Sequence, residues 1–185
     1  MAKWNKELEA TRFYRYYTDN GGLTEADWQG LMPYFEFKEV NNNNYLLREG
    51  EVCHFTFFVE SGLLNSFSLD EKGGEHIIQF LPENWIVSDR SSQYFNAPSS
   101  YFIKAIEPSV IVYMQRDFIE KAVALSPAFA CFQDSSLQRY IHVQQKRINS
   151  LLAMSAKSRY LSFIEMYPSL VLRVPQWMIA SYLGI

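Results

Sequence analysis

Residues that bind metals or cross-link chains are scarce in this sequence, which has two cysteines and three histidines among 185 residues. Cys53 and Cys131 lie far apart, so they have neither the spacing of zinc ligands nor that of a disulfide framework, and we expect both to be buried thiols. The histidines, His54, His76 and His142, do not form the close set that a metal site requires. The sequence therefore predicts no metal and no cofactor.

Long apolar runs are also absent. No segment of about 18 apolar residues is available to cross a membrane, and residues 1–7 lack the apolar stretch of a signal peptide. With 48% hydrophobic residues, the chain is long enough to bury one good core and a small second unit. We therefore expect a globular, cytoplasmic protein without a membrane partner.

Basic residues are in the minority, with 17 lysines and arginines against 20 acids and a net charge of −3. Their distribution is more informative than their sum. From Ser135 onward the chain carries six basic residues and one acid, a charge of +5, whereas the first 134 residues carry −8. The six are Arg139, Lys146, Arg147, Lys157, Arg159 and Arg173. This asymmetry favours an acidic sensing module joined to a basic module that approaches phosphate, and the alternative is a solvated basic helix face.

The period of the hydrophobic pattern changes along the chain. Residues 4–32 have helix-like spacing, broken at Gly21 and Gly22, with Thr24 as a helix cap. Residues 34–115 then divide into short β-rich runs separated by turns, which indicates an antiparallel sandwich or jelly roll. The runs are 34–40, 45–47, 54–60, 62–69, 76–80, 85–86, 101–107 and 110–115.

Helical spacing returns after residue 115. A short helix is expected over 116–126, and a longer one over 127–154, with no glycine and no internal proline. Two apolar stripes run along the longer helix, which is more than a sandwich face alone requires. The first comprises Phe129, Phe132, Ser136, Tyr140, Val143 and Leu151, and the second Ala130, Leu137, Ile141, Ile148 and Leu152. We therefore predict a homodimer with the second stripe as its seam, in preference to a helix wrapped along the barrel.

The last segment, residues 155–185, has the pattern of the start of a helix-turn-helix. One helix is expected over 156–166 and another after Pro175, which suits a first helical turn. Gly184 would supply the positive φ of a tight inter-helix turn, and Ile185 would return to the core. The second, base-reading helix is not in the sequence, so we expect an incomplete motif. The alternative is a capped amphipathic helix.

Several motifs in the β-rich part resemble one family. Residues 46–52 and 57–62 resemble the paired glycine turns of a cyclic nucleotide-binding β-roll, residues 70–75 its hairpin turn, and residues 77–85 the strand that leads to the effector site. In this order, β-roll, long helix and helix-turn-helix, the chain resembles the Crp/Fnr superfamily of bacterial transcription regulators. The resemblance implies an α+β fold with a double-stranded β-helix (jelly roll). Its parts would be a cyclic nucleotide-binding-like effector domain over 1–126, a dimerisation helix over 127–154 and an incomplete winged helix-turn-helix DNA-binding domain over 155–185.

The sequence departs from that family at the loop that binds the cyclic phosphate. Nucleotide-binding members carry Gly-Glu after the strand and Arg-Ser about ten residues later, and the arginine and nearby backbone N–H groups hold the phosphate. Here the first pair falls on Val87 and Ser88 and the second on Ser99 and Ser100. Both charged groups are missing, so cyclic AMP is not expected to bind.

Six residues of this loop form the candidate ligand-binding set: Ser88, Asp89, Arg90, Ser99, Ser100 and Tyr101. Arg90 would either replace the lost charge from another angle or pair with Asp89 at the surface. Aromatic residues around the loop would either line an apolar cavity or fill it. They are Phe55, Phe57, Phe58, Tyr94, Phe95, Tyr101 and Phe102. The sensors of this family that use an iron–sulfur cluster need about four clustered cysteines, which this chain does not have, and the sequence does not identify an effector.

These observations together predict a dimeric, non-enzymatic transcription regulator with a degenerate effector pocket. Its expected partners are DNA and a second copy of the chain, and Gln176 and Trp177 are the candidate contacts to the DNA backbone. Two alternatives belong to other classes. One is a stand-alone β-roll module for ligand binding or signalling without DNA binding. The other is a cupin enzyme, whose metal site would need several histidines and a carboxylate close together.

Overall fold

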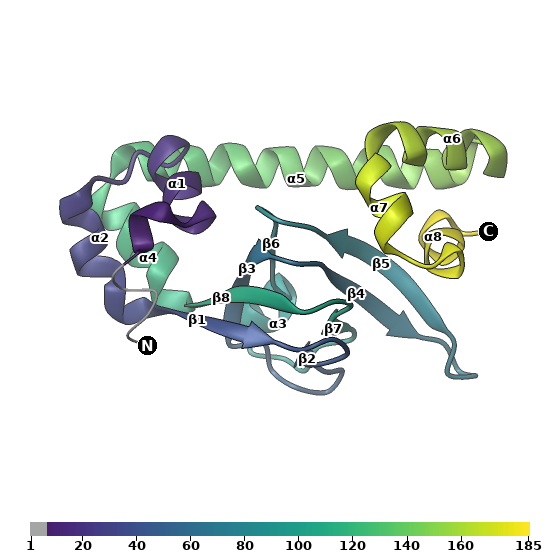
Figure 1. Cartoon of the computed structure of the whole chain (residues 1–185), viewed down its shortest axis with the longest axis horizontal. Coiled ribbons are helices and arrows are strands. Elements are labelled where there is room, and N and C mark those ends of the chain that lie inside the picture. Colours follow the sequence, from purple (N-terminus) through teal and green to yellow (C-terminus); the bar gives the residue numbers. More distant parts are fainter. Residues whose placement is uncertain (1–6) are drawn as a thin grey trace.

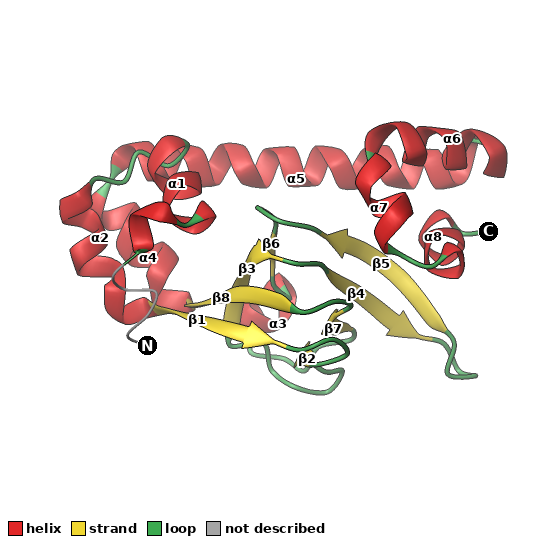
Figure 2. Cartoon of the chain, viewed as in Figure 1, coloured by secondary structure: helices red, strands yellow, loops and turns green. Residues whose placement is uncertain are grey.

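A computed structural model describes residues 7–185, so the first three residues of the helical stretch expected over 4–32 lie outside the described part. Figure 1 shows a central β-roll with helices at both ends and one long helix, α5 (Pro127–Ala153), that spans them. In Figure 2 the strands form the centre of the molecule and the helices its two ends. Within residues 7–185, no helix is both long enough and apolar enough to cross a membrane.

The β-roll consists of two four-stranded sheets in which every paired strand is antiparallel. The first sheet has the order β1 (Phe35–Val40), β8 (Ser109–Gln115), β3 (Phe55–Ser61) and β6 (Ile86–Val87). The second has the order β2 (Tyr45–Leu47), β7 (Phe102–Ala105), β4 (Leu64–Leu69) and β5 (Glu75–Leu81). The predicted antiparallel jelly roll is therefore confirmed, with strand ends within a few residues of those expected.

Gly62 shows why a glycine is needed at the turn between β3 and β4. Its φ is +96°, and a Cβ atom there would lie 2.2 Å from the Oγ of Ser109. The Ser109 hydroxyl accepts a hydrogen bond from the N–H of Leu63 and donates one to the carbonyl of Glu107. This close approach joins the two sheets at a point where a side chain cannot fit.

The helices at the N-terminal end enclose an aromatic core. They are η2 (Leu8–Ala10), α1 (Arg12–Asp19), α2 (Glu25–Leu31), η3 (Met32–Tyr34), α4 (Arg116–Leu125) and the first turns of α5. Phe13 lies at its centre, with ring contacts to Tyr17, Trp28 and Phe118 among others. Thr24 caps α2 as expected, in a capping box with Asp27. Burial of these large rings holds the helices on the first sheet.

The long helix is fully buried only at its beginning, although Arg147 nearer its end contacts β5 and α8. Phe129 and Phe132 are its buried residues, and both pack in the aromatic core. From Tyr140 onward the apolar residues of both stripes are exposed, including Val143 and Ile148. The exposed thiol of Cys131 corrects the expectation that both cysteines are buried.

The C-terminal unit consists of three helices: α6 (Ala156–Met166), α7 (Pro168–Arg173) and α8 (Gln176–Leu183). The expected helices, over 156–166 and after Pro175, did not include α7. Pro168 occupies the first turn of this additional helix. Gly184 has the expected positive φ, +65°. Ile185 is 61% exposed, so its predicted return to the core is wrong.

Candidate functional site

The loop predicted to hold a ligand folds into a short helix, α3 (Arg90–Phe95), between β6 and β7. Asp89 is its N-cap, and the carboxylate accepts a hydrogen bond from the N–H of Ser92 at 2.9 Å. The side chain is buried, with only 4% of the residue exposed. Asp is a preferred N-cap residue because its carboxylate accepts a hydrogen bond from an N–H in the first turn. Asp89 was therefore a signal in the sequence for the start of α3.

Ser92 and Cys53 belong to the same buried site, although neither was among the six candidate residues. The Ser92 hydroxyl accepts from the N–H of Cys53 at 2.9 Å and donates to the carbonyl of Ala97 at 2.6 Å. Burial raises the pKa of the Cys53 thiol, and the nearby Asp89 carboxylate also raises it. The thiol therefore stays protonated at neutral pH, which is the state of a structural cysteine and not of a nucleophile.

Ser99 and Tyr101 close the other side of the loop. The backbone of Ser99 bonds to the turn at residues 50–51, and its hydroxyl donates to the carbonyl of Tyr101 at 2.9 Å. The Tyr101 hydroxyl donates to the carbonyl of Ser88 at 3.1 Å. Burial raises the pKa of Tyr101, so the phenol remains a neutral donor. Four of the six candidate residues, Ser88, Asp89, Ser99 and Tyr101, are thus joined in one hydrogen-bonded region.

Arg90 and Ser100, the other two candidates, point outward and are exposed. Among the described residues Arg90 forms no ion pair with Asp89, because the Asp89 carboxylate is engaged as the helix cap. Tyr94 and Phe95 are 76% and 71% exposed. The expectation that they line or fill a pocket is therefore wrong, since they lie on the outer face of α3.

The electrostatics of this site oppose an anionic ligand. The N-terminal end of a helix normally attracts a phosphate group, because its free N–H groups and its dipole are positive. In α3 that end is occupied by the Asp89 carboxylate, and within residues 7–185 no basic side chain pairs with it. An incoming phosphate at this end of α3 would meet the negative charge of Asp89. Nor do any three His, Cys, Asp or Glu side chains of the described part gather as a metal site.

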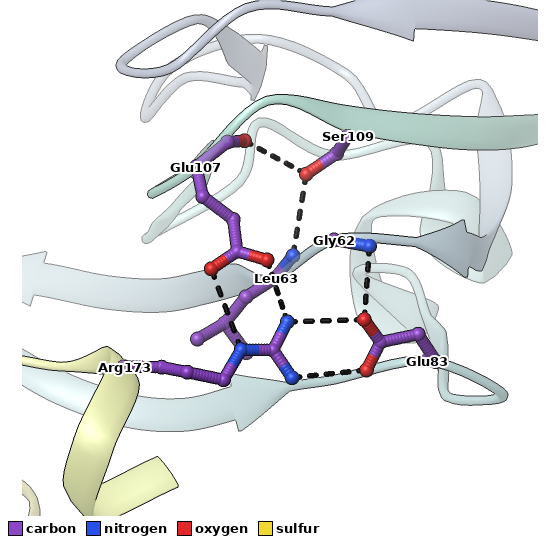
Figure 3. A network of polar contacts seen from close by, with 6 residues as sticks. All are labelled: Gly62, Leu63, Glu83, Glu107, Ser109 and Arg173. Carbon is purple, nitrogen blue, oxygen red and sulfur yellow. Dashed lines mark hydrogen bonds and ion pairs between the residues drawn. The ribbon is translucent and has the colours of Figure 1, made fainter. Parts of the chain in front are cut away.

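A second polar site joins the C-terminal unit to the β-roll (Figure 3). Arg173, the last residue of α7, donates two parallel hydrogen bonds to the Glu83 carboxylate, each of 3.0 Å. It also binds Glu107, with Nη2 2.6 Å from Oε1. The N–H of Gly62 donates to the same Glu83 carboxylate at 3.1 Å. This geometry fixes the end of α7 against the loops that follow β5 and β7.

Apolar and polar contacts continue this docking surface along β5. Phe67 and Ile77 of the second sheet pack with Ile179 and Leu183 of α8 in one buried cluster. The hydroxyl of Ser181 accepts from the N–H of Ile77 and donates to the carbonyl of Glu75. Because α8 satisfies these groups, part of the open edge of β5 is covered.

The docking contacts change the interpretation of the basic C-terminal segment. Arg173 is neutralised by two glutamates, Arg147 donates to carbonyl groups of β5 and α8, and Arg159 donates to the carbonyls of Leu183 and Gly184. Three of the six basic residues therefore serve internal contacts. The segment charge of +5 therefore overstates the charge that is available to a phosphate backbone.

Comparison by sequence relates the β-roll to one family. Residues 37–125 match the family of the cyclic nucleotide-binding domain. No curated protein matches the chain in a sequence search. The matched part includes both sheets apart from the first residues of β1, together with α3 and α4. This part of the chain is similar to a cyclic nucleotide-binding domain in sequence and in fold.

Solved structures extend the likeness to the rest of the chain. FixK2 from Bradyrhizobium japonicum has a TM-score of 0.70 at 16% identity, covering 82% of this chain and 78% of its own. The catabolite activator protein of Thermus thermophilus has a TM-score of 0.58 at 16% identity, covering 88% and 78%. DNR from Pseudomonas aeruginosa has a TM-score of 0.56 at 15% identity, covering 100% and 83%. These structural neighbours are Crp/Fnr regulators, and at such identities the likeness is one of fold.

Proposed function

We propose that this protein is a cytoplasmic transcription regulator of the Crp/Fnr type that does not respond to cyclic AMP. The observation that carries the proposal is the order of parts in one chain. A β-roll is followed by a helix of 27 residues that has an exposed apolar side. A helical unit comes next, with a left-handed turn after α8. The fold likeness to DNR over the whole chain supports the same assignment.

The buried Asp89 carboxylate supports a degenerate effector pocket. A cyclic phosphate needs a positive group, and Arg90 is exposed at the start of α3, where its side chain forms no hydrogen bond or ion pair with the described residues of the loop. Ser88 and Ser99 carry hydroxyl groups that cannot neutralise a phosphate charge. The Ser99 hydroxyl already donates to the carbonyl of Tyr101, and the Ser88 carbonyl accepts from the Tyr101 phenol. The pocket is therefore closed by its own polar contacts.

The start of α8 is the element proposed to approach DNA. Gln176 is exposed and Trp177 is 51% exposed. No side chain caps the helix, because Pro175 occupies the N-cap position. The first N–H groups of α8 are therefore free to meet a phosphate, with Gln176 and Trp177 beside them. Two copies joined through α5 would present two such ends to one duplex.

DNA association of the 185-residue chain tests this proposal by fluorescence anisotropy. We expect weak binding to any duplex, with a Kd of about 10–100 µM at low salt and a steep loss as salt rises. Among the described residues no helix follows the Gly184 turn to enter the major groove, so no sequence preference is expected. Gln176→Glu should weaken binding about fivefold, because it places a negative charge at the phosphate site.

Gln29→Glu is the matched control, since it makes the same charge change at an exposed position on α2, at the other end of the molecule from α8 (Figure 1). It should leave the affinity within about twofold of that of the unmodified chain. Equal effects of the two substitutions, or no salt-dependent binding at all, would remove α8 from DNA contact. The second candidate, a stand-alone β-roll module without DNA binding, would then be preferred. The internal pairing of Arg147, Arg159 and Arg173 favours this candidate.

A further inference from the structure

A small cavity lies where four elements meet. It has a volume of about 20 Å³ and is bordered by β5, α5, α6 and α8, among others. A cavity of at least about 10–15 Å³ holds one water-sized group. The space therefore suits a single small ion or molecule and excludes a nucleotide. It uses none of the candidate residues of the α3 loop.

Arg147 of α5 brings an uncompensated positive charge to this cavity. Its Nη1 donates to the carbonyl of Ile78, and its Nη2 to the carbonyls of Ile77 and Tyr182. Nε is buried and has no hydrogen-bond partner in the described part of the chain. No acid within residues 7–185 forms an ion pair with this guanidinium. Burial lowers the pKa of Arg147, which reflects the cost of an isolated buried charge.

The other polar groups at the cavity are able to donate. Gln79, Gln144, Tyr167 and Tyr182 line it, and within residues 7–185 none of their side chains forms a hydrogen bond. Burial raises the pKa of Tyr167 and of Tyr182, so both phenols keep their protons. A cavity with two amide groups, two neutral phenols and one guanidinium Nε offers many donors and no negative charge.

We infer that this cavity binds one small anion of about the size of chloride. Arg147 supplies the positive charge, and the amide and phenol groups around it supply neutral donors. An anion there neutralises a charge that the protein leaves unpaired. It also connects α5, β5 and α8, so its binding favours the docked position of the C-terminal unit. The inference does not depend on the proposed regulator function.

Thermal unfolding in different salts tests the inference. The chain is heated in sodium chloride and in sodium gluconate at equal ionic strength and pH, since gluconate is too large for the cavity. At chloride concentrations about a hundredfold above its Kd, the Tm should be about 5 °C higher in chloride. Gln144→Met removes one donor and keeps the length of the side chain, so it should abolish most of this difference. Gln145→Met, at the exposed neighbouring position, should preserve it.

Crystals containing sodium bromide give a second, direct measurement. An anomalous peak within hydrogen-bond distance of the Nε of Arg147 would support the anion site without any mutation. No peak there, together with the same Tm in chloride and gluconate, would overturn the inference and leave a cavity that holds water only. Equal salt effects in the Gln144→Met and Gln145→Met chains would also overturn it.

Discussion

Replacing Ile141 and Ile148 of α5 by glutamate should convert the protein from a dimer into a monomer. These side chains are 41% and 56% exposed in the single chain and lie about two turns apart on the second apolar stripe. Burial of such a side chain contributes about 1.5–3 kcal/mol, and a carboxylate in the same place would face its symmetry mate without a partner. The dimer Kd should rise at least about a thousandfold. Sedimentation equilibrium at micromolar concentration measures the change.

Leu161→Glu with Leu172→Glu is the matched control for this substitution. Both leucines are more than half exposed, but they lie on α6 and α7, outside the predicted seam. This chain should remain dimeric. A monomer for the unmodified chain at micromolar concentration would show that the seam is assigned wrongly. An equal loss of dimer in the control would move the interface to the C-terminal unit.

Arg173→Ala should loosen the C-terminal unit from the β-roll while leaving the roll folded. The substitution removes both parallel bonds to Glu83 and leaves Glu83 and Glu107 facing each other without a cation. Hydrogen bonds to charged groups contribute about 1.5–3 kcal/mol, so opening should become about ten- to a hundredfold more frequent. Hydrogen exchange of the α8 amide groups should accelerate by that factor, with little change in β3 and β8.

Arg116→Ala is the control, because Arg116 pairs with Glu120 only at the surface. Its loss should not change α8 exchange.

The unmodified chain should also open in acid. Burial alone would raise the pKa of Glu83, but hydrogen bonds from Arg173 and the Gly62 N–H outweigh it, so the pKa lies below its ordinary value. The stabilisation is therefore present above the ordinary pKa of glutamate and is lost as the pH falls through the lowered one. The reference is the protection of the α8 amides in the unmodified chain at neutral pH, relative to the intrinsic exchange rate at each pH. If these amides are equally protected in acid, or in the Arg173→Ala chain, Arg173 does not hold the unit.

The strands and the long helices were predictable because their signals are local. Runs rich in aromatic and β-branched residues indicate β3 and β8, and the absence of glycine over 27 residues allows α5. The two helices that were missed, α3 and α7, have six residues each and little amphipathic pattern. Each depends on one residue at its start, Asp89 as a cap and Pro168 in the first turn. Asp and Pro are common in turns as well as at helix starts, so neither residue alone indicates a helix.

The candidate site was predictable in part for the same reason. Ser88, Asp89, Ser99 and Tyr101 are close in the sequence, and the loop brings them together. Cys53 joins them from 39 positions away through Ser92, a contact that no local pattern announces. The pairing of Arg173 with Glu83 is likewise a tertiary contact, 90 positions apart. A count of charges cannot show which of them are already neutralised.

Calorimetric titration with cyclic AMP and cyclic GMP tests the central claim, that this cyclic nucleotide-binding fold has a loop closed to cyclic nucleotides. With the Asp89 carboxylate at the start of α3 and no cation beside it, neither ligand should bind more tightly than about millimolar, or −4 kcal/mol. Micromolar binding, about −8 kcal/mol, would contradict the claim. Arg90 would then have to turn into the loop, and Arg90→Ala should abolish the binding.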